Sequence, residues 1–130
     1  MSEQPVTSGA YCTGRPDLKS RPLLSPMQAG QLMGLFKVLA NDTRLRLLHQ
    51  ITRTGEVGVT ALAEAVGMSP QAVSNQLQRL ADWRILAPRR DGNNVLYRVV
   101  DCCVPALLDL GLCLMEESQA GAGPRRPVPE

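Results

Sequence analysis

The feature that most constrains the fold is a pair of predicted helices joined at Gly67 within residues 60–82. Thr60 offers a capping hydroxyl to the first, short helix, and Gly67 gives the backbone the freedom for a tight turn. Ser69 and Pro70 start the second helix, because a capping hydroxyl followed by a proline is typical of helix N-termini. Two short helices around a glycine turn predict a helix-turn-helix.

The same signals divide the rest of the chain into helices and one hairpin. Two strand-like segments, 85–87 and 95–99, flank residues 89–94, which have the composition of a hairpin turn. The predicted helices, each marked by a polar cap and by apolar residues at helical spacing, cover 26–40, 42–54, 61–66, 70–82 and 104–118. Their apolar stripes include Leu45, Leu48 and Ile51 on the second helix, and Val73, Leu77 and Leu80 on the fourth. The sequence therefore predicts a mainly α fold with a small β-hairpin wing, a winged helix-turn-helix.

Glycine and proline mark the limits of the folded part. Residues 1–24 and 119–130 are rich in both and have little apolar periodicity, so we expect a disordered N-terminal arm and a disordered C-terminal tail. Residues 25–118 then form a single domain, as expected for a chain of 130 residues. The apolar runs are short and the start does not resemble a signal peptide, so we expect a cytoplasmic protein that does not enter a membrane.

The charge pattern favours DNA as a partner. Residues 41–100 carry eight arginines against five acidic residues. Ser69 places a helix N-terminus where it can face a phosphate, and Arg89 and Arg90 in the predicted wing can contact the DNA backbone or a minor groove. Side chains that can read base edges gather on the outer face of the second helix, namely Gln71, Ser74, Asn75, Gln78 and Arg79. A merely solvated face, or an interaction module that never binds DNA, is the alternative.

Other classes of function find less support. The chain has one histidine, His49, so a mechanism that needs two histidines in one chain is excluded. No nucleophile pair, general base or cofactor loop is visible, and we expect the protein not to be an enzyme. We expect His49 to lie on the surface or to line a groove, and Trp83 to be a core or hinge residue. Residues 42–44 are expected to form a cap and an ion pair, with a phosphate contact by Arg44 or Arg46 as the alternative.

Three segments resemble the ArsR/SmtB family of winged-helix repressors. Residues 35–48, Leu-Phe-Lys-Val-Leu-Ala-Asn-Asp-Thr-Arg-Leu-Arg-Leu-Leu, are similar to the family signature F-K-A-L-A-D-x-T-R-L-x-I-L. Residues 69–77 resemble its recognition helix, S-x-x-x-V-S-x-H-L, with Gln76 in place of the usual histidine. Arg89-Arg90-Asp91-Gly92 and Tyr97-Arg98 resemble its wing.

The resemblance implies a homodimer that packs through its first and last helices, so that residues 25–118 serve both DNA binding and dimerisation. It also implies double-stranded DNA with a palindromic operator as the partner, and a repressor that a metal or metalloid ion releases in many members. One thiolate site of the family is missing, because Gly58 and Thr60 stand where its E-L-C-V-C-D-L box has cysteines. A second family site, on the last helix, is matched approximately, with sulfur in place of imidazole.

Geometry limits how the cysteines of the last helix can act. Cys102 and Cys113 are eleven residues apart, which leaves them about 20° apart around a helix and about 16 Å apart along it. One ion cannot reach both within a chain, since a zinc–sulfur bond is about 2.3 Å long. In an antiparallel pair of last helices, Cys102 and Cys103 of one subunit approach Cys113 of the other. This requires the backbone at the vicinal pair not to be helical yet, and Asp101 as a cap makes that plausible.

A site of two or three thiolates favours soft ions, and we expect mercury, cadmium, lead, arsenic or antimony as the inducer ahead of zinc. Cys12 in the N-terminal arm is a further candidate ligand, and an unused thiol is its alternative. Buried, inert cysteines are the alternative for the other three. A thiol redox switch, or a repressor with no ligand, also remains open.

Overall fold

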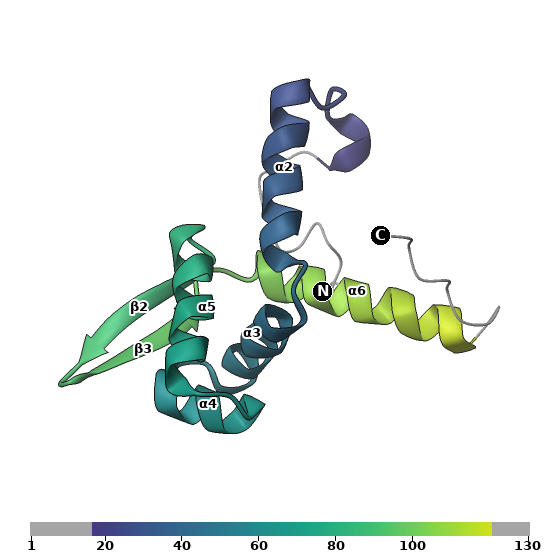
Figure 1. Cartoon of the computed structure of the whole chain (residues 1–130). Helices are drawn as coiled ribbons and strands as arrows, with labels where there is room; N and C mark the ends of the chain where they lie inside the picture. The colour runs from purple at the N-terminus through teal and green to yellow at the C-terminus, as the bar shows by residue number, and fades with distance from the viewer. Residues whose placement is uncertain (1–16, 121–130) are drawn as a thin grey trace, which may run out of the picture.

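The computed structural model describes residues 17–120, which form a mainly helical fold with one small sheet (Figure 1). The helical elements are the 3-10 turn η1 (Leu18–Ser20), α2 (Pro26–Leu39), α3 (Asp42–Thr54), α4 (Val59–Val66), α5 (Pro70–Asp82) and α6 (Cys103–Ala120). The strands are β1 (Val57–Gly58), β2 (Leu86–Asp91) and β3 (Asn94–Val99). The predicted winged helix-turn-helix is confirmed, with α4 and α5 as the helix pair and β2 and β3 as the wing. The predicted disordered ends lie mostly outside the described residues.

Three of the predicted helix starts are made by the side chains expected. The Ser25 hydroxyl accepts a hydrogen bond from the Gln28 amide at 3.1 Å, and the Ser25 amide donates one to the Gln28 side chain at 3.0 Å. Asn41 caps α3 and Ser69 caps α5 in the same way, through the backbone amide three residues later. Each cap satisfies a backbone donor that a helix start leaves without a partner, which explains why the sequence located these starts correctly.

The start of α4 differs from the prediction. Gly58 occupies the cap position, no side-chain hydrogen bond caps the helix, and Thr60 lies inside its first turn. The cause is strand β1, in which Val57 pairs with Tyr97 and Gly58 with Leu96 of β3. A strand of two residues is too short to show a periodicity in the sequence, so the third strand of the sheet was not predicted.

The wing is longer and its turn tighter than predicted. Asp91 pairs with Asn94, which leaves Gly92 and Asn93 as a two-residue loop, and Gly92 has a φ of 66°. Positive φ is readily available to glycine and suits such a hairpin. The correction matters for function, because Arg89 and Arg90 lie on strand β2 and not in the turn.

The core is built from α3, α4, α5 and the sheet. Its fully buried side chains are Leu47, Leu48, Ile51, Leu62, Val73, Leu77 and Leu80. The predicted stripe of α5 is confirmed, and so are Leu48 and Ile51 of the predicted stripe of α3, whereas Leu45 was wrong. Leu47 is fully buried, whereas Leu45 is 37% exposed. Leu45 lies on the other side of α3, where it lines a groove beside α6.

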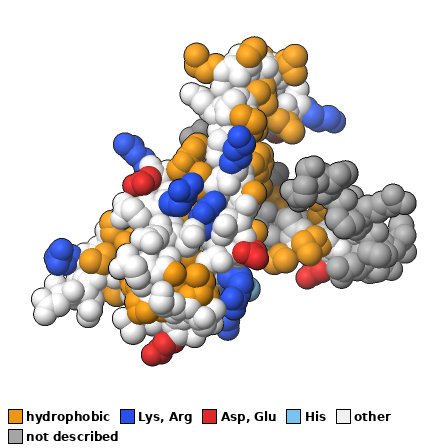
Figure 2. All heavy atoms as spheres, in the orientation of Figure 1, with side chains coloured by type: hydrophobic (Ala, Val, Ile, Leu, Met, Phe, Trp, Pro, Cys, Tyr) orange, Lys and Arg blue, Asp and Glu red, His pale blue; other side chains and the backbone are white. Residues whose placement is uncertain are grey.

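Helices α2 and α6 project from this core and leave apolar side chains exposed (Figure 1, Figure 2). On α2 only Val38 and Leu39 are buried, although the helix is rich in apolar residues. The large apolar side chains exposed on the two helices are Met27, Leu32, Met33, Phe36, Leu110, Leu112, Leu114 and Met115. Exposed apolar surface on this scale marks an interaction site. In the described part of the chain, no helix combines the length and the apolar character that crossing a membrane requires.

The role of backbone conformation can be tested by replacing each of two glycines with alanine, because the two changes should shift the free energy of unfolding in opposite directions. Gly67 has a φ of 72°, whereas Gly30 lies inside α2, and a Cβ added at either glycine meets open space. We expect Gly67→Ala to lower the free energy of unfolding by about 1 kcal/mol, because alanine is strained at positive φ. Gly30→Ala should raise it by up to about 1 kcal/mol, because alanine is the better helix former. Urea denaturation at matched protein concentration checks both, and equal effects of the two substitutions would contradict the account.

Candidate DNA interface and thiol site

The predicted base-reading side chains lie along one helix, α5. Its buried residues hold it against the core, and the polar residues between them face outward. Gln71 donates to Asn75 at 3.1 Å and Gln78 donates to Asp82 at 3.0 Å, each one helical turn further on. Ser74 is half-buried, whereas Gln71, Asn75, Gln78 and Arg79 are exposed. The amide side chains are thus held along the surface of α5, where base edges can displace these hydrogen bonds.

The hydroxyl of Ser69 already accepts a hydrogen bond within α5 in the absence of a ligand. Its hydroxyl accepts the Ala72 amide at 3.1 Å, and Pro70 follows it in the first turn. The remaining amides of the first turn and the positive end of the helix dipole lie at the surface, an arrangement that favours a phosphate. The side chain of Ser69 therefore contributes chiefly by fixing the start of α5.

The two wing arginines are in different situations. Arg89 donates two hydrogen bonds to the Glu56 carboxylate, both at 2.8 Å. These bonds hold the pKa of Glu56 below its ordinary value and raise that of Arg89. Arg90 is exposed and, as the next residue of a strand, points to the opposite face. A phosphate must compete with Glu56 for Arg89, whereas it can reach Arg90 directly.

The three C-terminal cysteines of the prediction are all exposed. Cys102 precedes α6 and Cys103 is its first residue, and the Asp101 carboxylate accepts the Cys103 amide at 2.9 Å. The predicted cap is thus present, and the vicinal pair straddles the boundary between loop and helix. Just past the middle of α6, Cys113 lies 3.7 Å from Glu117, whose charge raises the pKa of the Cys113 thiol. Cys12 lies outside the described residues.

A single chain does not bring these thiols together. Among the residues that the structure describes, no three His, Cys, Asp or Glu side chains are placed to share a metal ion. This agrees with the rise of about 16 Å between Cys102 and Cys113 along a helix. All three thiols are exposed in the single chain. An ion that joins Cys113 to Cys102 or Cys103 therefore needs two copies of the chain.

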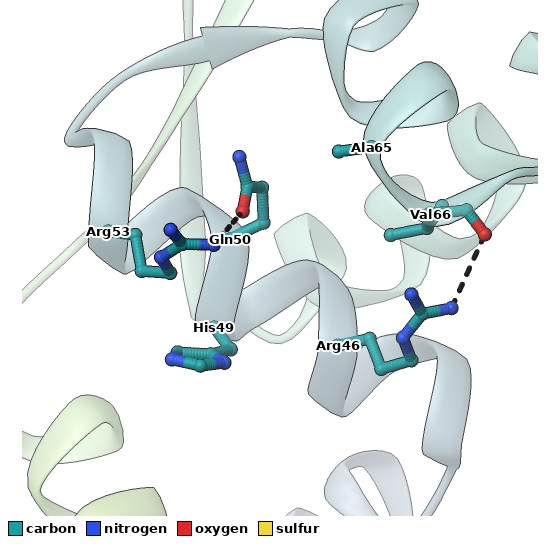
Figure 3. Close-up of a pocket in the computed structure, with 6 residues that line it drawn as sticks. All are labelled: Arg46, His49, Gln50, Arg53, Ala65 and Val66. Carbon is teal, nitrogen blue, oxygen red and sulfur yellow. Dashed lines mark hydrogen bonds between the residues drawn. The ribbon is translucent and has the colours of Figure 1, made fainter.

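Two hollows flank α3. One is an apolar groove of about 870 Å³ between the end of α2, the side of α3 and α6, and Cys102 lies on its rim. The other is a basic pocket of about 160 Å³ between α3 and α4 (Figure 3). There Arg46 donates to the Val66 carbonyl at 3.3 Å and Arg53 to Gln50 at 3.1 Å. His49 lines both hollows, as predicted.

The prediction for Arg44 was wrong. Its side chain is 8% exposed, and it is the one buried polar or charged residue of the described chain. It donates to the Val38 carbonyl at 2.6 Å and to the Gln76 side chain at 2.8 Å. It is thus neither an ion pair with a neighbour on α3 nor a phosphate contact. The pairing with Gln76 spans 32 residues, and nothing local in the sequence signals it.

Comparison with known proteins places the chain among transcriptional regulators. Residues 39–101 match a family model described as HVO_A0114. The crystal structure of the AntR antimony-specific transcriptional repressor is 60% identical, with a TM-score of 0.71, and the match covers 84% of this chain and 98% of that one. The HTH-type transcriptional regulator NmtR of Mycobacterium tuberculosis is 36% identical over 104 residues, which are 80% of this chain and 86% of NmtR.

A third neighbour bears on assembly. The solution structure of a homodimeric winged helix-turn-helix DNA-binding domain from Mycobacterium bovis, described as a possible ArsR-family regulator, is 27% identical. Its TM-score is 0.65, and the match covers 89% of this chain and 100% of that chain. The fold predicted from the sequence is thus found in regulators of known structure.

The contrast between the wing arginines gives a prediction for DNA binding. Arg90→Ala should lower the slope of log K against log salt by about one, the value for one lost phosphate contact. Arg89→Ala should have a smaller effect, because Arg89 must first leave Glu56. Glu56→Gln should tighten binding, since it removes the competing carboxylate, while Glu64→Gln on α4 serves as the charge-matched control. Fluorescence anisotropy with a duplex over a salt series measures all four, and a larger effect for Arg89→Ala would contradict the assignment.

Proposed function

The chain belongs to the ArsR/SmtB family of metal-responsive winged-helix transcriptional regulators, and we propose that it is a homodimeric repressor that trivalent antimony or arsenic releases from DNA. The inducer binds Cys102 and Cys103 of one subunit and Cys113 of the other. The observation that carries the proposal is the placement of three exposed thiols along α6, two at its start and one just past its middle. That placement forms a site only between two antiparallel copies of α6.

The donor set supports a soft ion. Three sulfur donors favour thiophilic ions over nickel, cobalt or zinc. Mercury, cadmium and lead share this preference, so the donors alone do not separate them from the trivalent metalloids. The antimony specificity in the description of AntR, at 60% identity, favours antimony and its close relative arsenic. When bound, the ion would join thiolates of two subunits, and the three cysteines would supply its ligands.

The surface supports the dimer. Apolar side chains of α2 and α6, such as Met27, Leu32 and Leu110, are 41–73% exposed among residues 17–120, and a second copy of the chain would cover them. Cys113 lies within the α6 part of this surface, so packing of the two helices would bring the thiols to the interface. The homodimeric state of the related domain from Mycobacterium bovis supports the same assembly.

The placement of the two recognition helices follows from the same assembly. A two-fold axis between α6 helices presents one α5 helix on each side, which suits two half-sites of a palindromic operator about one helical turn apart. Because binding is linked, the ion weakens DNA binding by the factor by which DNA weakens ion binding, typically 5- to 150-fold. Thiol oxidation, in place of ion binding, is the competing outcome that the experiment must separate.

The test is a titration of the reduced full chain with antimonite, arsenite, mercury, cadmium and lead. Thiolate-to-ion absorption reports binding, and anisotropy of a labelled promoter duplex reports release in parallel. We expect antimonite to bind at one ion per subunit and to release the DNA. Cys102→Ser should keep DNA binding and lose release, because only two thiolates remain at each site. Cys12→Ser is the matched control, and loss of release in it would add the N-terminal arm to the site.

Two outcomes would overturn the proposal in different ways. Full release of Cys102→Ser by every soft ion would show that the ligands lie elsewhere. Release of the wild type by a mild oxidant, with no response to any ion under reducing conditions, would establish the redox switch instead.

A further inference from the structure

The dimerisation helix α2 is joined to the recognition helix α5 through a buried arginine. Arg44 lies in the first turn of α3, but its guanidinium reaches away from that helix in two directions. Its Nε donates to the Val38 carbonyl in the last turn of α2, and one terminal nitrogen donates to Gln76 Oε1 in the middle of α5. Arg44 is 8% exposed, so both bonds are made by a charge that has little water around it.

Burial makes this bridge stiff. A guanidinium held from water must keep its hydrogen bonds, because a buried charge without acceptors is costly. Hydrogen bonds from a charged donor are also short and directional, as the 2.6 and 2.8 Å distances here illustrate. Val38 and Gln76 therefore cannot move apart freely. The end of α2 and the middle of α5 keep one relative position as long as the bridge is intact.

A second contact joins the same two helices further along. Trp83 caps the C-terminus of α5, and its indole lies against the backbone of α2 at Gly34. A Cβ added at Gly34 would lie 2.8 Å from Cη2 and 3.3 Å from Cζ2 of Trp83, so the fit depends on the absence of a side chain there. One turn earlier, a Cβ at Gly30 meets open space. The close approach is therefore local to the indole.

We propose that these two contacts set the orientation of the recognition helix relative to the dimerisation helix, and that they transmit the inducer signal to DNA. In Figure 1, α2 projects from the body, and the upper end of α5 lies at the level of the lower half of α2. Two contacts some way apart along α5 define a direction as well as a position. A shift of α2 at the dimer interface then moves α5 as a rigid element. The inference rests on the proposed dimeric repressor, with Arg44, Gln76 and Trp83 as positioning residues.

The first test measures geometry without the inducer. DNA affinity of the full chain is compared on its operator and on operators with one base pair added or removed between the half-sites. A rigid dimer should bind the altered operators at least about fivefold more weakly, the scale of one mismatched base pair. Gln76→Met removes the acceptor of Arg44, and Gly34→Ala displaces the indole. In both variants we expect the discrimination between spacings to fall to about twofold or less.

Two matched variants separate positioning from general damage. Gln76→Glu also removes the amide but keeps the acceptor oxygens, and Gly30→Ala adds the same methyl group to α2 in open space. Both should discriminate between spacings as the wild type does. Dimer association is measured by analytical ultracentrifugation in all five proteins. Trp83 is the only tryptophan of the chain, so its emission should change in Gly34→Ala and not in Gly30→Ala.

The second test measures transmission. The factor by which antimonite weakens DNA binding should fall in Gln76→Met and Gly34→Ala, while the stoichiometry of antimonite stays unchanged. Wild-type spacing discrimination in both of these variants would overturn the inference. If the wild type does not respond to antimonite, the proposed inducer is wrong, and the spacing measurements still decide whether the contacts position α5.

Discussion

The fold depends on how apolar surface is shared between one chain and a second copy. Helices α3, α4 and α5 and the sheet together bury the core of the chain. Helices α2 and α6 leave Phe36, Leu110 and Leu114 exposed, because no residue between 17 and 120 covers their outer faces. Each chain therefore buries the core of its DNA-binding part by itself, whereas the layer formed by α2 and α6 needs a second copy to bury its apolar side chains. Since the thiols lie in that layer, the proposed sensing site forms only when the layer is completed.

Local signals in the sequence predicted the parts of the fold that local interactions determine. Each of the caps Ser25, Asn41 and Ser69 acts on an amide three residues away, so the sequence locates it directly. The errors arose where distant residues decide. Thr60 does not cap α4, because residues 57 and 58 pair with β3 and the helix begins directly after them, at Val59. Leu45 is exposed because α6 leaves a groove beside it, which no periodicity within α3 can reveal.

The candidate site divides in the same way. The sequence indicated the polar face of α5 and the thiols at the start and just past the middle of α6, because helix geometry alone places residues on a face. It did not indicate that Glu56 binds Arg89 or that Gln76 accepts from Arg44, since these pairs are separated by 33 and 32 residues. Both pairs involve arginines that looked available for phosphate. Partners brought by the fold thus decide which arginines of a basic sequence remain available for DNA, and Arg90 is favoured over Arg89 and Arg44.

The residue at position 76 also determines how the bridge responds to its surroundings. The motif that residues 69–77 resemble usually has histidine there, and this chain has glutamine. An imidazole accepts a hydrogen bond from Arg44 only while it is neutral, and its protonation would place a second positive charge beside a buried guanidinium. The amide oxygen of Gln76 accepts at any pH in the physiological range. The link between α2 and α5 is therefore independent of proton concentration, which leaves movement at the dimer interface as the input that can change it.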